Sequence, residues 1–417
     1  MTIAPTKRPY DPLDVAAYSF WDQPAEGRDA VWRELRRERP ISWHRPIEGG
    51  MMAPENDGVW VVTTQELIKE VSLNPAIFCS GEGTMFEEVP PDVNEAAASF
   101  LGMDAPRHGQ LRRLVSSAFT PRRVEQIHAQ VKVQAREIVD HLIEVGEGDF
   151  VDLVSKRLPM WTINELLGFD AQQRQEAASW ANELVSWADE DVAAGREPGE
   201  VLNDALIALL RLGYDFAEKR RRAPANDLMT GLVQAEVDGQ KLTDDEIASF
   251  FVLLSVAGND TTRHTISLTA RALQQFPEQR ALLLEDYAGR IDVAMDEFVR
   301  WATPVMTFRR TATRDTVLGG QEIKEGEWVA MVFSSGNRDE RVYADPDVFD
   351  ITRNPNPHVG FGAGGPHFCM GQFLAKMQIR EIFDQLLHRV PTMELGEPTY
   401  LTGNFVRAVR SMPVVIR

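Results

Sequence analysis

Hydrophobic and polar positions recur with two different periods along the chain. Apolar residues at steps of three and four, typical of amphipathic helices, predict helices over residues 26–39, 63–73, 121–146, 151–167, 171–188, 200–222 and 243–276. Short runs rich in β-branched and aromatic residues predict strands at 41–47 and 59–64, and a pair of strands around Gly319 and Gly320. The pattern therefore predicts a fold that is mainly α with small β-sheets, of the α+β class.

Nothing in the sequence divides the chain into parts. It contains no repeat, no low-complexity tract and no linker rich in Ser or Pro, so residues 1–417 are expected to form a single domain. Residues 74–103 have little regular pattern. A loop of that length inside a compact domain is usually functional or disordered, and this one is a candidate lid over a binding site.

Composition and charge exclude several classes of protein. Hydrophobic residues make up 43% of the chain, which is enough for a substantial core, and the net charge of −19 argues against binding to nucleic acid or anionic membranes. Two cysteines make a disulfide framework improbable and fit a reducing compartment. The N-terminus lacks the apolar segment of a signal peptide, and the longest apolar run, 250–257, is far shorter than the roughly 20 residues of a membrane span. A cytoplasmic protein without a membrane anchor is expected.

The most informative stretch is the Gly-rich sequence FGAGGPHFCMG at residues 361–371. A helix pattern follows directly, so 359–390 reads as one unit in which Cys369 lies where a loop becomes a helix. The free N–H groups and positive end of that helix would lower the pKa of the thiol and favour a thiolate metal ligand. Haem iron is a metal that such a ligand holds. The alternative is a buried structural cysteine.

A second pattern places His108 and Arg112 four residues apart on a helix that Pro106 can begin. Both side chains then project from one face of the helix. Such a face can hold a carboxylate, and arginine does so bidentately, which would suit a haem propionate. The alternative is a solvated basic surface, because Arg107 and Arg113 stand alongside.

A third pattern, AGNDTT at residues 257–262, interrupts the apolar helix predicted over 243–276. Threonine hydroxyls there can compete for the carbonyls of the helix and open a local groove. Oxygen activation needs protons, which Asp260 could carry and Thr261 could pass on by hydrogen bonding. Ala257 would leave room beside a haem. The alternative is a polar patch whose hydroxyls bond back to the helix.

These motifs resemble, in the same order, those of the cytochrome P450 family, and the resemblance runs from about Val59 to the C-terminus. The Gly-rich loop resembles the haem-binding loop Phe-x-x-Gly-x-x-x-Cys-x-Gly of that family, although Phe361 precedes Cys369 by eight residues, where the commonest pattern has seven. The extra residue resembles the GG-P-H variant of some actinobacterial sterol- and lipid-oxidising members. The AGNDTT stretch matches the oxygen-activation motif of the family residue for residue.

The resemblance implies a single-domain cytochrome P450 fold with haem b and assigns roles around it. Cys369 would be the axial thiolate, and the oxygen-side helix 243–276 would carry the proton-handling residues Asp260 and Thr261. The other implied haem contacts are His108, Arg112, Ala257, Arg310, Phe361, His367 and Gly371. Arg309 is the neighbouring candidate to Arg310, because strand alternation allows only one of them to face the haem.

Two further groups of residues follow from the resemblance. Glu297, Arg300 and Arg353 would form a buried structural salt-bridge network behind the haem loop, although Glu297 and Arg300 alone read as a routine surface pair. The implied substrate pocket would be lined by Met85, Phe86 and Phe100 from the lid 74–103 and by Val305 and Met306 after Pro304.

The implied function is a monooxygenase that inserts one atom of O2 into a C–H bond of a small apolar substrate, with steroids, sterols, branched lipids or terpenoids favoured. No G-x-G-x-x-G motif indicates a built-in flavin or NAD domain, so a ferredoxin and a separate NAD(P)H-dependent reductase are expected to supply electrons. The ferredoxin would dock around Cys369, near Lys376 and Arg380. A tailoring enzyme of secondary metabolism remains an alternative. A fatty-acid peroxygenase would not need Asp260 and Thr261, and a non-catalytic haem sensor would need no proton relay.

Overall fold

The computed structural model describes residues 8–48, 52, 54, 56–89, 100–116, 121–187, 190–237 and 239–417. The helices are α1 (Tyr18–Trp21), α2 (Ala25–Glu38), α3 (Gln65–Leu73), α5 (Arg107–Ser116), α6 (Pro121–Val145), α7 (Arg157–Leu167), α8 (Ala171–Val185), α9 (Glu190–Ala193), α10 (Pro198–Arg222), α11 (Leu228–Gln234), α12 (Asp244–Ala257), α13 (Asp260–Gln275), α14 (Pro277–Glu285), α15 (Tyr287–Ala302), α16 (Phe333–Gly336) and α17 (Gln372–Arg389), with a 3-10 turn η1 (Phe100–Gly102) and a π turn η3 (Val151–Ser155).

The strands are short and lie in several small sheets. They are β1 (Ile41–His44), β2 (Val59–Val62), β3 (Phe78–Cys79), β4 (Glu147–Asp149), β5 (Glu236–Val237), β6 (Gln240–Lys241), β7 (Thr307–Ala312), β8 (Thr316–Leu318), β9 (Gln321–Ile323), β10 (Trp328–Val332), β11 (Met393–Leu395), β12 (Thr399–Tyr400), β13 (Val409–Ser411) and β14 (Pro413–Ile416). The predicted fold class, mainly α with small sheets, is confirmed. No helix in the described ranges is long and apolar enough to cross a membrane.

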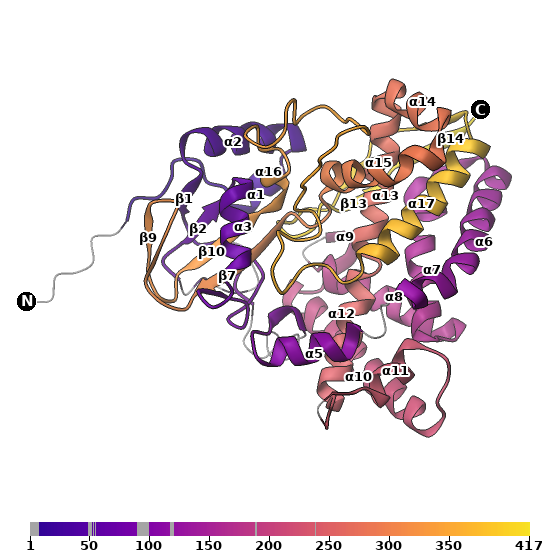
Figure 1. Ribbon diagram of the computed structural model, residues 1–417, viewed down its shortest axis with the longest axis horizontal. Coiled ribbons are helices and arrows are strands. Elements are labelled where there is room, and N and C mark those ends of the chain that lie inside the picture. The colour runs from indigo at the N-terminus through magenta and orange to yellow at the C-terminus, as the bar shows by residue number, and fades with distance from the viewer. Residues whose placement is uncertain are drawn as a thin grey trace, which may run out of the picture.

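The main sheet joins segments from both ends of the sequence. Its strand order is β1-β2-β10-β7-β3, with β2 and β10 parallel and the other pairs antiparallel. Figure 1 shows the early strands β1 and β2 beside the late strands β7 and β10 on one side, and most of the helices on the other. The sheet packs on α3 in one apolar cluster, whereas α6, α7, α10, α12, α13, α15 and α17 share the large helical core.

One detailed sequence prediction is confirmed and one needs correction. The pair of strands predicted around Gly319 and Gly320 is the hairpin of β8 and β9, which is separate from the main sheet, where β7 pairs with β10. The segment predicted as one helix over 151–167 begins as the π turn η3 and continues as α7. The local sequence pattern thus predicts both the hairpin and the helical segment. It does not predict that the first turn of the helical segment is a π turn.

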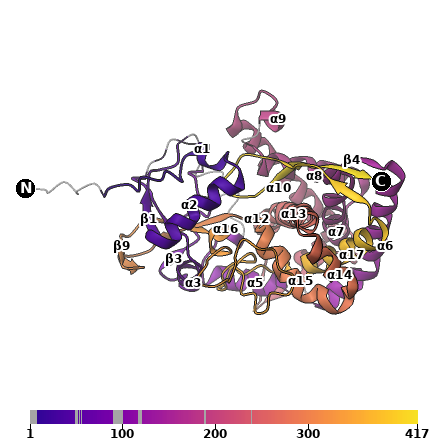
Figure 2. The same ribbon diagram turned by 90° about the horizontal axis from the view of Figure 1, so that it is seen from above.

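The oxygen-side helix predicted over 243–276 consists of two helices in line. It begins as expected, because Thr243 accepts a hydrogen bond from the Glu246 backbone (3.2 Å) and Glu246 accepts one from the Thr243 backbone (2.9 Å), which is a capping box. The break lies at Gly258, where an added Cβ would come within 2.2 Å of the Ile163 side chain of α7. Close packing against α7 therefore requires glycine at the break. Figure 2 shows α12 and α13 near the centre of the molecule.

Candidate active site

The Cys369 loop is held in place by backbone contacts. The Cys369 N–H donates to the Phe361 carbonyl (2.9 Å), and the loop is anchored to α3 by a hydrogen bond from Ser72 Oγ to the Gly364 carbonyl (2.9 Å). Gly365 has φ +77°, and a Cβ there would lie 2.3 Å from the Ser72 carbonyl oxygen. Glycine is needed at that position because both the left-handed backbone and the approach to α3 exclude a side chain.

The thiol of Cys369 lies at the start of α17, as the sequence predicts, but its pKa differs from the expectation. Burial raises the pKa of the thiol, and the N–H groups of Gly371 and Gln372 and the charge on Arg112 oppose that effect without outweighing it. Desolvation disfavours a charged sulfur more than one helix terminus favours it. A metal cation would reverse the balance, because a coordinating thiol loses its proton outright.

Four basic side chains converge beside this loop. Arg112 donates from Nη2 to the Phe368 carbonyl (2.6 Å) and from Nη1 to the Pro366 carbonyl, while the rings of His108 and His367 lie 4.2 Å apart between centroids. Arg310 is 5% exposed, and its positive charge lowers the pKa of both histidines, secondary to burial. Burial also lowers the pKa of the Arg310 guanidinium to about 10.

The cluster fits a group that carries carboxylates. His108 Nε2 and His367 Nδ1 are buried without a hydrogen-bond partner in the described part of the chain, and Arg310 donates only to the carbonyl of its neighbour Arg309 (2.7 Å). Buried donors without acceptors are costly unless a ligand supplies the acceptors. A thiolate with a bidentate-capable arginine and unsatisfied donors beside it therefore suits a haem with two propionates.

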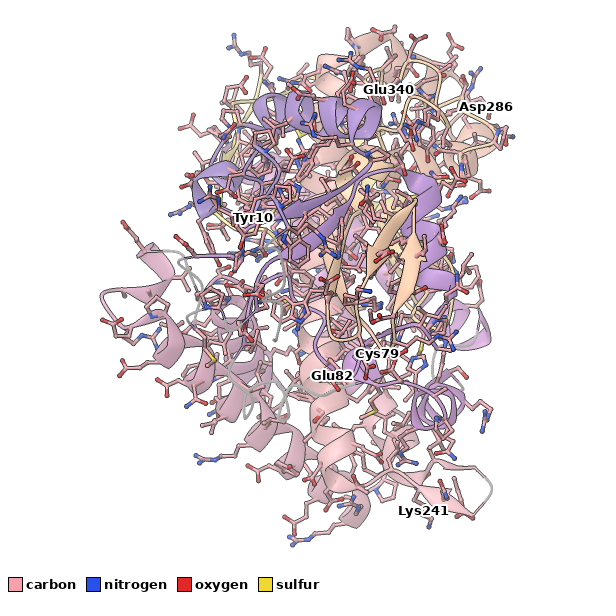
Figure 3. The ribbon with its side chains drawn as sticks, turned by 90° about the vertical axis from the view of Figure 1, so that its left-hand side faces the viewer. Tyr10, Cys79, Glu82, Lys241, Asp286 and Glu340 are labelled. Atoms are coloured by element: carbon pink, nitrogen blue, oxygen red, sulfur yellow. The ribbon has the colours of Figure 1, made fainter. Side chains whose placement is uncertain are left out.

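Arg309 and Arg310 point to opposite faces of β7. The Arg309 guanidinium stacks 3.3 Å from the centre of the Trp328 ring and donates to the Glu82 carbonyl (2.9 Å). Figure 3 shows Glu82 beside Cys79, the last residue of β3. Of the two neighbours, Arg310 and not Arg309 acts on His108 and His367. The geometry therefore favours Arg310, the residue that the family resemblance implies, and agrees with strand alternation, which allows only one of the two to face the haem.

The break between α12 and α13 carries the residues of the AGNDTT stretch. Thr261 Oγ1 donates a hydrogen bond to the Ala257 carbonyl (2.9 Å). Ala257 itself is exposed. Asp260 is only 1% exposed, and its nearest charged partner is Arg263, with Oδ1 and Nε 3.1 Å apart. The Thr261 hydroxyl thus bonds back to its own helix, which is the alternative interpretation given for this stretch. The buried Asp260 carboxyl has no exposed surface at which solvent could protonate it directly.

The three residues predicted for a rear network lie together. Glu297 and Arg300 are fully buried and form a bidentate pair with two distances of 2.7 Å, and Arg353 Nε lies 3.4 Å from Glu297 Oε2. The other acceptors and donors of the Glu297–Arg300 pair are satisfied by Asn337 O, Pro346 O, Val348 O, the Asp350 N–H and the Asn356 amide, whereas Arg353 Nε has no hydrogen-bond partner in the described part of the chain. A buried ion pair needs such partners, and their presence agrees with the predicted structural role.

The predicted pocket residues divide into two groups. Met85, Phe100 and Val305 keep part of their side chains exposed, and Phe100 lies against His108 with ring centroids 4.6 Å apart. Phe86 and Met306 are 1% and 3% exposed and pack in the N-terminal aromatic cluster, so the structure does not place them on an open wall. Residues 90–99 of the expected lid lie outside the described residues.

A further neighbour of Val305 and Met306, which no sequence pattern predicts, is the C-terminal segment 404–406. Val406 forms a β-bridge with Val305, and the Phe405 carbonyl accepts from the Met306 N–H (2.8 Å). The Phe405 ring packs 5.3 Å from that of Phe308. No local signal marks this segment, because its partners lie about a hundred residues earlier in the chain.

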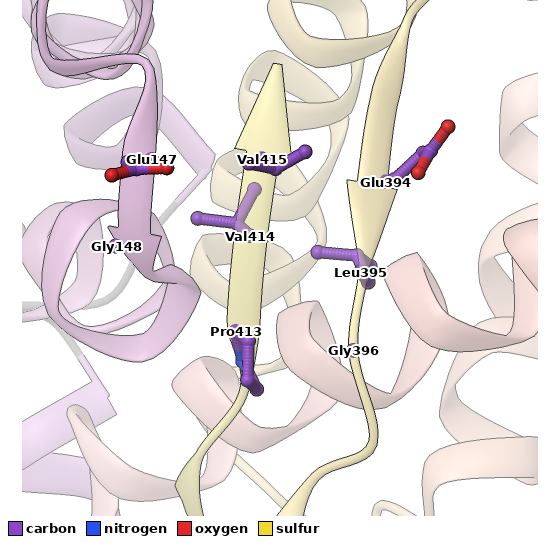
Figure 4. A pocket seen from close by; sticks show the side chains of 8 residues that line it. All are labelled: Glu147, Gly148, Glu394, Leu395, Gly396, Pro413, Val414 and Val415. Carbon is purple, nitrogen blue, oxygen red and sulfur yellow. The ribbon is translucent and has the colours of Figure 1, made fainter. Parts of the chain in front are cut away.

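A separate hollow of about 540 Å³ lies on the three-stranded sheet β11-β14-β4. Figure 4 shows Glu147 and Glu394 on its outer strands, on either side of Val414 and Val415. Glu394 pairs with Arg417 (3.0 Å), and none of the predicted site residues lines this hollow. We assign no function to it.

Comparisons with known proteins agree with this geometry. A family model described as cytochrome P450 matches residues 291–393. The chain is 38% identical to the methyl-branched lipid omega-hydroxylase of Mycobacterium tuberculosis, over 98% of this chain and 96% of that protein. It is also 38% identical to the steroid C26-monooxygenase of Mycolicibacterium smegmatis, over 91% of this chain and 88% of that protein.

Solved structures show the same fold. The cytochrome P450 CYP268A2 of Mycobacterium marinum, in complex with pseudoionone, superposes with a TM-score of 0.95 at 49% identity, over 99% of this chain and all of that one. CYP109E1 of Bacillus megaterium, in complex with corticosterone, superposes with a TM-score of 0.80 at 26% identity, over 95% of this chain and 99% of that one. The chain therefore belongs to the cytochrome P450 family, and it is a monooxygenase with haem b on a thiolate ligand.

Proposed function

We propose that this monooxygenase hydroxylates the end of a methyl-branched apolar chain, in a branched lipid, a terpenoid or the side chain of a steroid. The observation that carries this proposal is the pair of relatives at 38% identity, an omega-hydroxylase of methyl-branched lipids and a steroid C26-monooxygenase. Both names describe oxidation at the end of a branched alkyl chain. The bound pseudoionone of the 49% identical structure is likewise a branched apolar molecule.

The chain's own residues take the following roles in the proposal. Cys369 would be the thiolate ligand of a bound haem, and His108, Arg112, Arg310 and His367 would donate hydrogen bonds to its propionates. When bound, the haem would supply the activation of O2. Thr261 presents a hydroxyl beside Ala257, and Asp260, whose pKa is raised by burial, would be the proton donor one residue away. Phe100, Val305 and Phe405 supply apolar surface at which an alkyl chain can lie.

A spectral titration of the ferric protein tests the substrate class. A methyl-branched fatty acid and a sterol with a branched side chain are expected to displace the iron's water and shift the Soret band to shorter wavelength. A linear fatty acid of equal carbon number is expected to bind more weakly. A shift only with a macrolide would keep the monooxygenase and reject the branched lipid, and equal affinity for linear and branched chains would reject recognition of the branch.

Electrons are proposed to come from a ferredoxin reduced by a separate NAD(P)H-dependent reductase. The predicted docking residues Lys376 and Arg380 are not free cations, because Lys376 pairs with Asp296 (2.6 Å) and Arg380 pairs with Asp292. Beside the Cys369 loop the structure instead exposes two apolar side chains, Leu73 at 56% and Phe373 at 55%. Apolar and aromatic residues carry much of the binding energy in protein interfaces.

Replacing Phe373 by aspartate is therefore expected to raise the ferredoxin concentration needed for half-maximal turnover by roughly tenfold, the effect of losing about 1.4 kcal/mol of binding. Turnover driven by hydrogen peroxide, which needs no ferredoxin, should stay unchanged. Val317→Asp, at a 62% exposed position on β8, is the matched control. If Phe373→Asp left the ferredoxin concentration for half-maximal turnover unchanged, ferredoxin would not dock at Phe373.

A further inference from the structure

Asp260 is buried in an unusual electrostatic setting. It is 1% exposed, and neither of its carboxyl oxygens has a hydrogen-bond partner in the described part of the chain. Its one recorded counter-charge is Arg263, one turn later on α13, with Nε 3.1 Å from Oδ1. Burial raises the pKa of the Asp260 carboxyl, and Arg263 acts to lower it. The position of the Arg263 guanidinium therefore decides how well an ionised Asp260 is compensated.

In the structure the Nε–H of Arg263 donates its hydrogen bond to His264 and not to Asp260. His264 Nε2 lies 3.3 Å from Arg263 Nε, and the His264 ring is fully buried. On its other side, His264 Nδ1 accepts a hydrogen bond from the Val409 N–H of β13 (3.1 Å). Burial and the charge on Arg263 lower the pKa of His264 well below its usual value, so the ring is neutral at neutral pH.

A neutral imidazole cannot satisfy both donors. It carries one N–H and one acceptor nitrogen. With the proton on Nε2, His264 keeps the bond from Val409 and leaves Arg263 Nε–H to Asp260. With the proton on Nδ1, His264 accepts from Arg263, loses Val409 and leaves Asp260 without a hydrogen bond. The cluster thus has two arrangements that differ in the partner of Arg263.

We propose that Arg263 is a positioning residue that alternates its Nε–H between Asp260 and His264, and thereby determines whether the Asp260 carboxyl is ionised or holds a proton. The consequence for catalysis rests on the proposed role of Asp260 as proton donor. When Arg263 turns to His264, the uncompensated carboxylate takes up one proton from solvent water on one oxygen, and it returns that proton to solvent water when Arg263 turns back. His264 exchanges its ring proton between Nε2 and Nδ1 with solvent in the same change. The charge of the Asp260 carboxyl beside Thr261 then follows the position of Arg263.

In the part of the chain that the structure describes, no charged group other than Arg263 shifts the pKa of Asp260 or of His264. The elements that contact α13 include η3, the helices α7, α12, α14, α15 and α17, and the strands β11 and β13. Arg263 is nevertheless the one charged residue in the described ranges that shifts the pKa of Asp260, and the same holds for His264. Replacements at Arg263 and His264 should therefore have simple and opposite effects.

Infrared difference spectroscopy of the ferric holoenzyme against pH measures the proposal directly. The carbonyl stretch of a protonated carboxylic acid that is absent in Asp260→Asn belongs to Asp260. In Arg263→Gln the midpoint of this band should rise by about 1 to 3 pH units, because the positive charge that favours the carboxylate is removed. In His264→Asn it should fall, because the amide oxygen can still accept from Val409 while the acceptor at Nε2 is lost, which leaves Arg263 to Asp260 alone.

Controls separate positioning from general damage. Arg271→Gln removes a charge from the same helix, where Arg271 pairs with Glu397, and should leave the band unmoved. Arg263→Lys should restore part of the shift because it keeps the charge. Shifts in the same direction for Arg263→Gln and His264→Asn, or none in either folded variant, would overturn the proposal. The spectra need no substrate, so a failure to oxidise any lipid would count against the proposed function and not against this inference.

Discussion

Replacement of Cys369 by serine is expected to reduce oxygenation below detection and to abolish the carbonmonoxy spectrum that marks a thiolate-bound haem. The thiolate is the ligand that favours O–O cleavage, and a serine hydroxyl cannot replace it as a charged, polarisable donor at neutral pH. The donors of His108, Arg112, Arg310 and His367 remain in this variant, so some haem should still bind. The measurement is the carbonmonoxy spectrum together with product formed per haem.

The second cysteine provides the matched control. Cys79 is a half-buried free thiol at the end of β3, outside the loop of residues 361–371. Cys79→Ser is expected to keep both the spectrum and the turnover of the unaltered protein. If Cys369→Ser retained the thiolate spectrum, the ligand would have to lie elsewhere and the proposed site would be wrong.

Replacement of Arg300 by methionine is expected to lower the free energy of unfolding by about 3–5 kcal/mol, because it leaves the buried Glu297 charge without its bidentate partner. Both side chains are fully buried, and Arg300 also donates to three backbone carbonyls. Denaturant unfolding measures the change, and haem content after expression should fall with it.

A double replacement and a surface control sharpen this test. Glu297→Gln combined with Arg300→Met should cost less than the sum of the two single changes, because the isolated buried charge is gone. Arg290→Met on the same helix α15 removes a partly exposed pair with Glu285 (3.4 Å) and should change stability by no more than about 1 kcal/mol. A loss at Arg300 as small as that at Arg290 would contradict a structural role for the network.

Local sequence signals predicted most of the elements that carry the site. The capping box at Thr243 located the start of α12, and the Gly-rich loop followed by an amphipathic run located Cys369 at the start of α17. Strand alternation separated Arg309 from Arg310 before any contact was known. These signals suffice because caps, turns and alternation depend on neighbouring residues alone.

Other features depend on tertiary packing and left no readable local trace. The close approach of Gly258 to Ile163 of α7 depends on tertiary packing, and the pairing of Val406 with Val305 joins segments about a hundred residues apart. The burial that raises the pKa of Cys369, and the competition of Asp260 and His264 for Arg263, likewise arise from neighbours that sequence spacing does not reveal.

Hydroxylation of a branched alkyl end is measured by turnover of a methyl-branched fatty acid under isotopically labelled O2, with a surrogate ferredoxin and reductase. The account predicts an alcohol at the branched end of the chain with one labelled oxygen atom, and no product when the electron supply is omitted. An unlabelled alcohol, or no oxidation of any branched lipid, terpenoid or sterol by the haem-loaded protein, would contradict it.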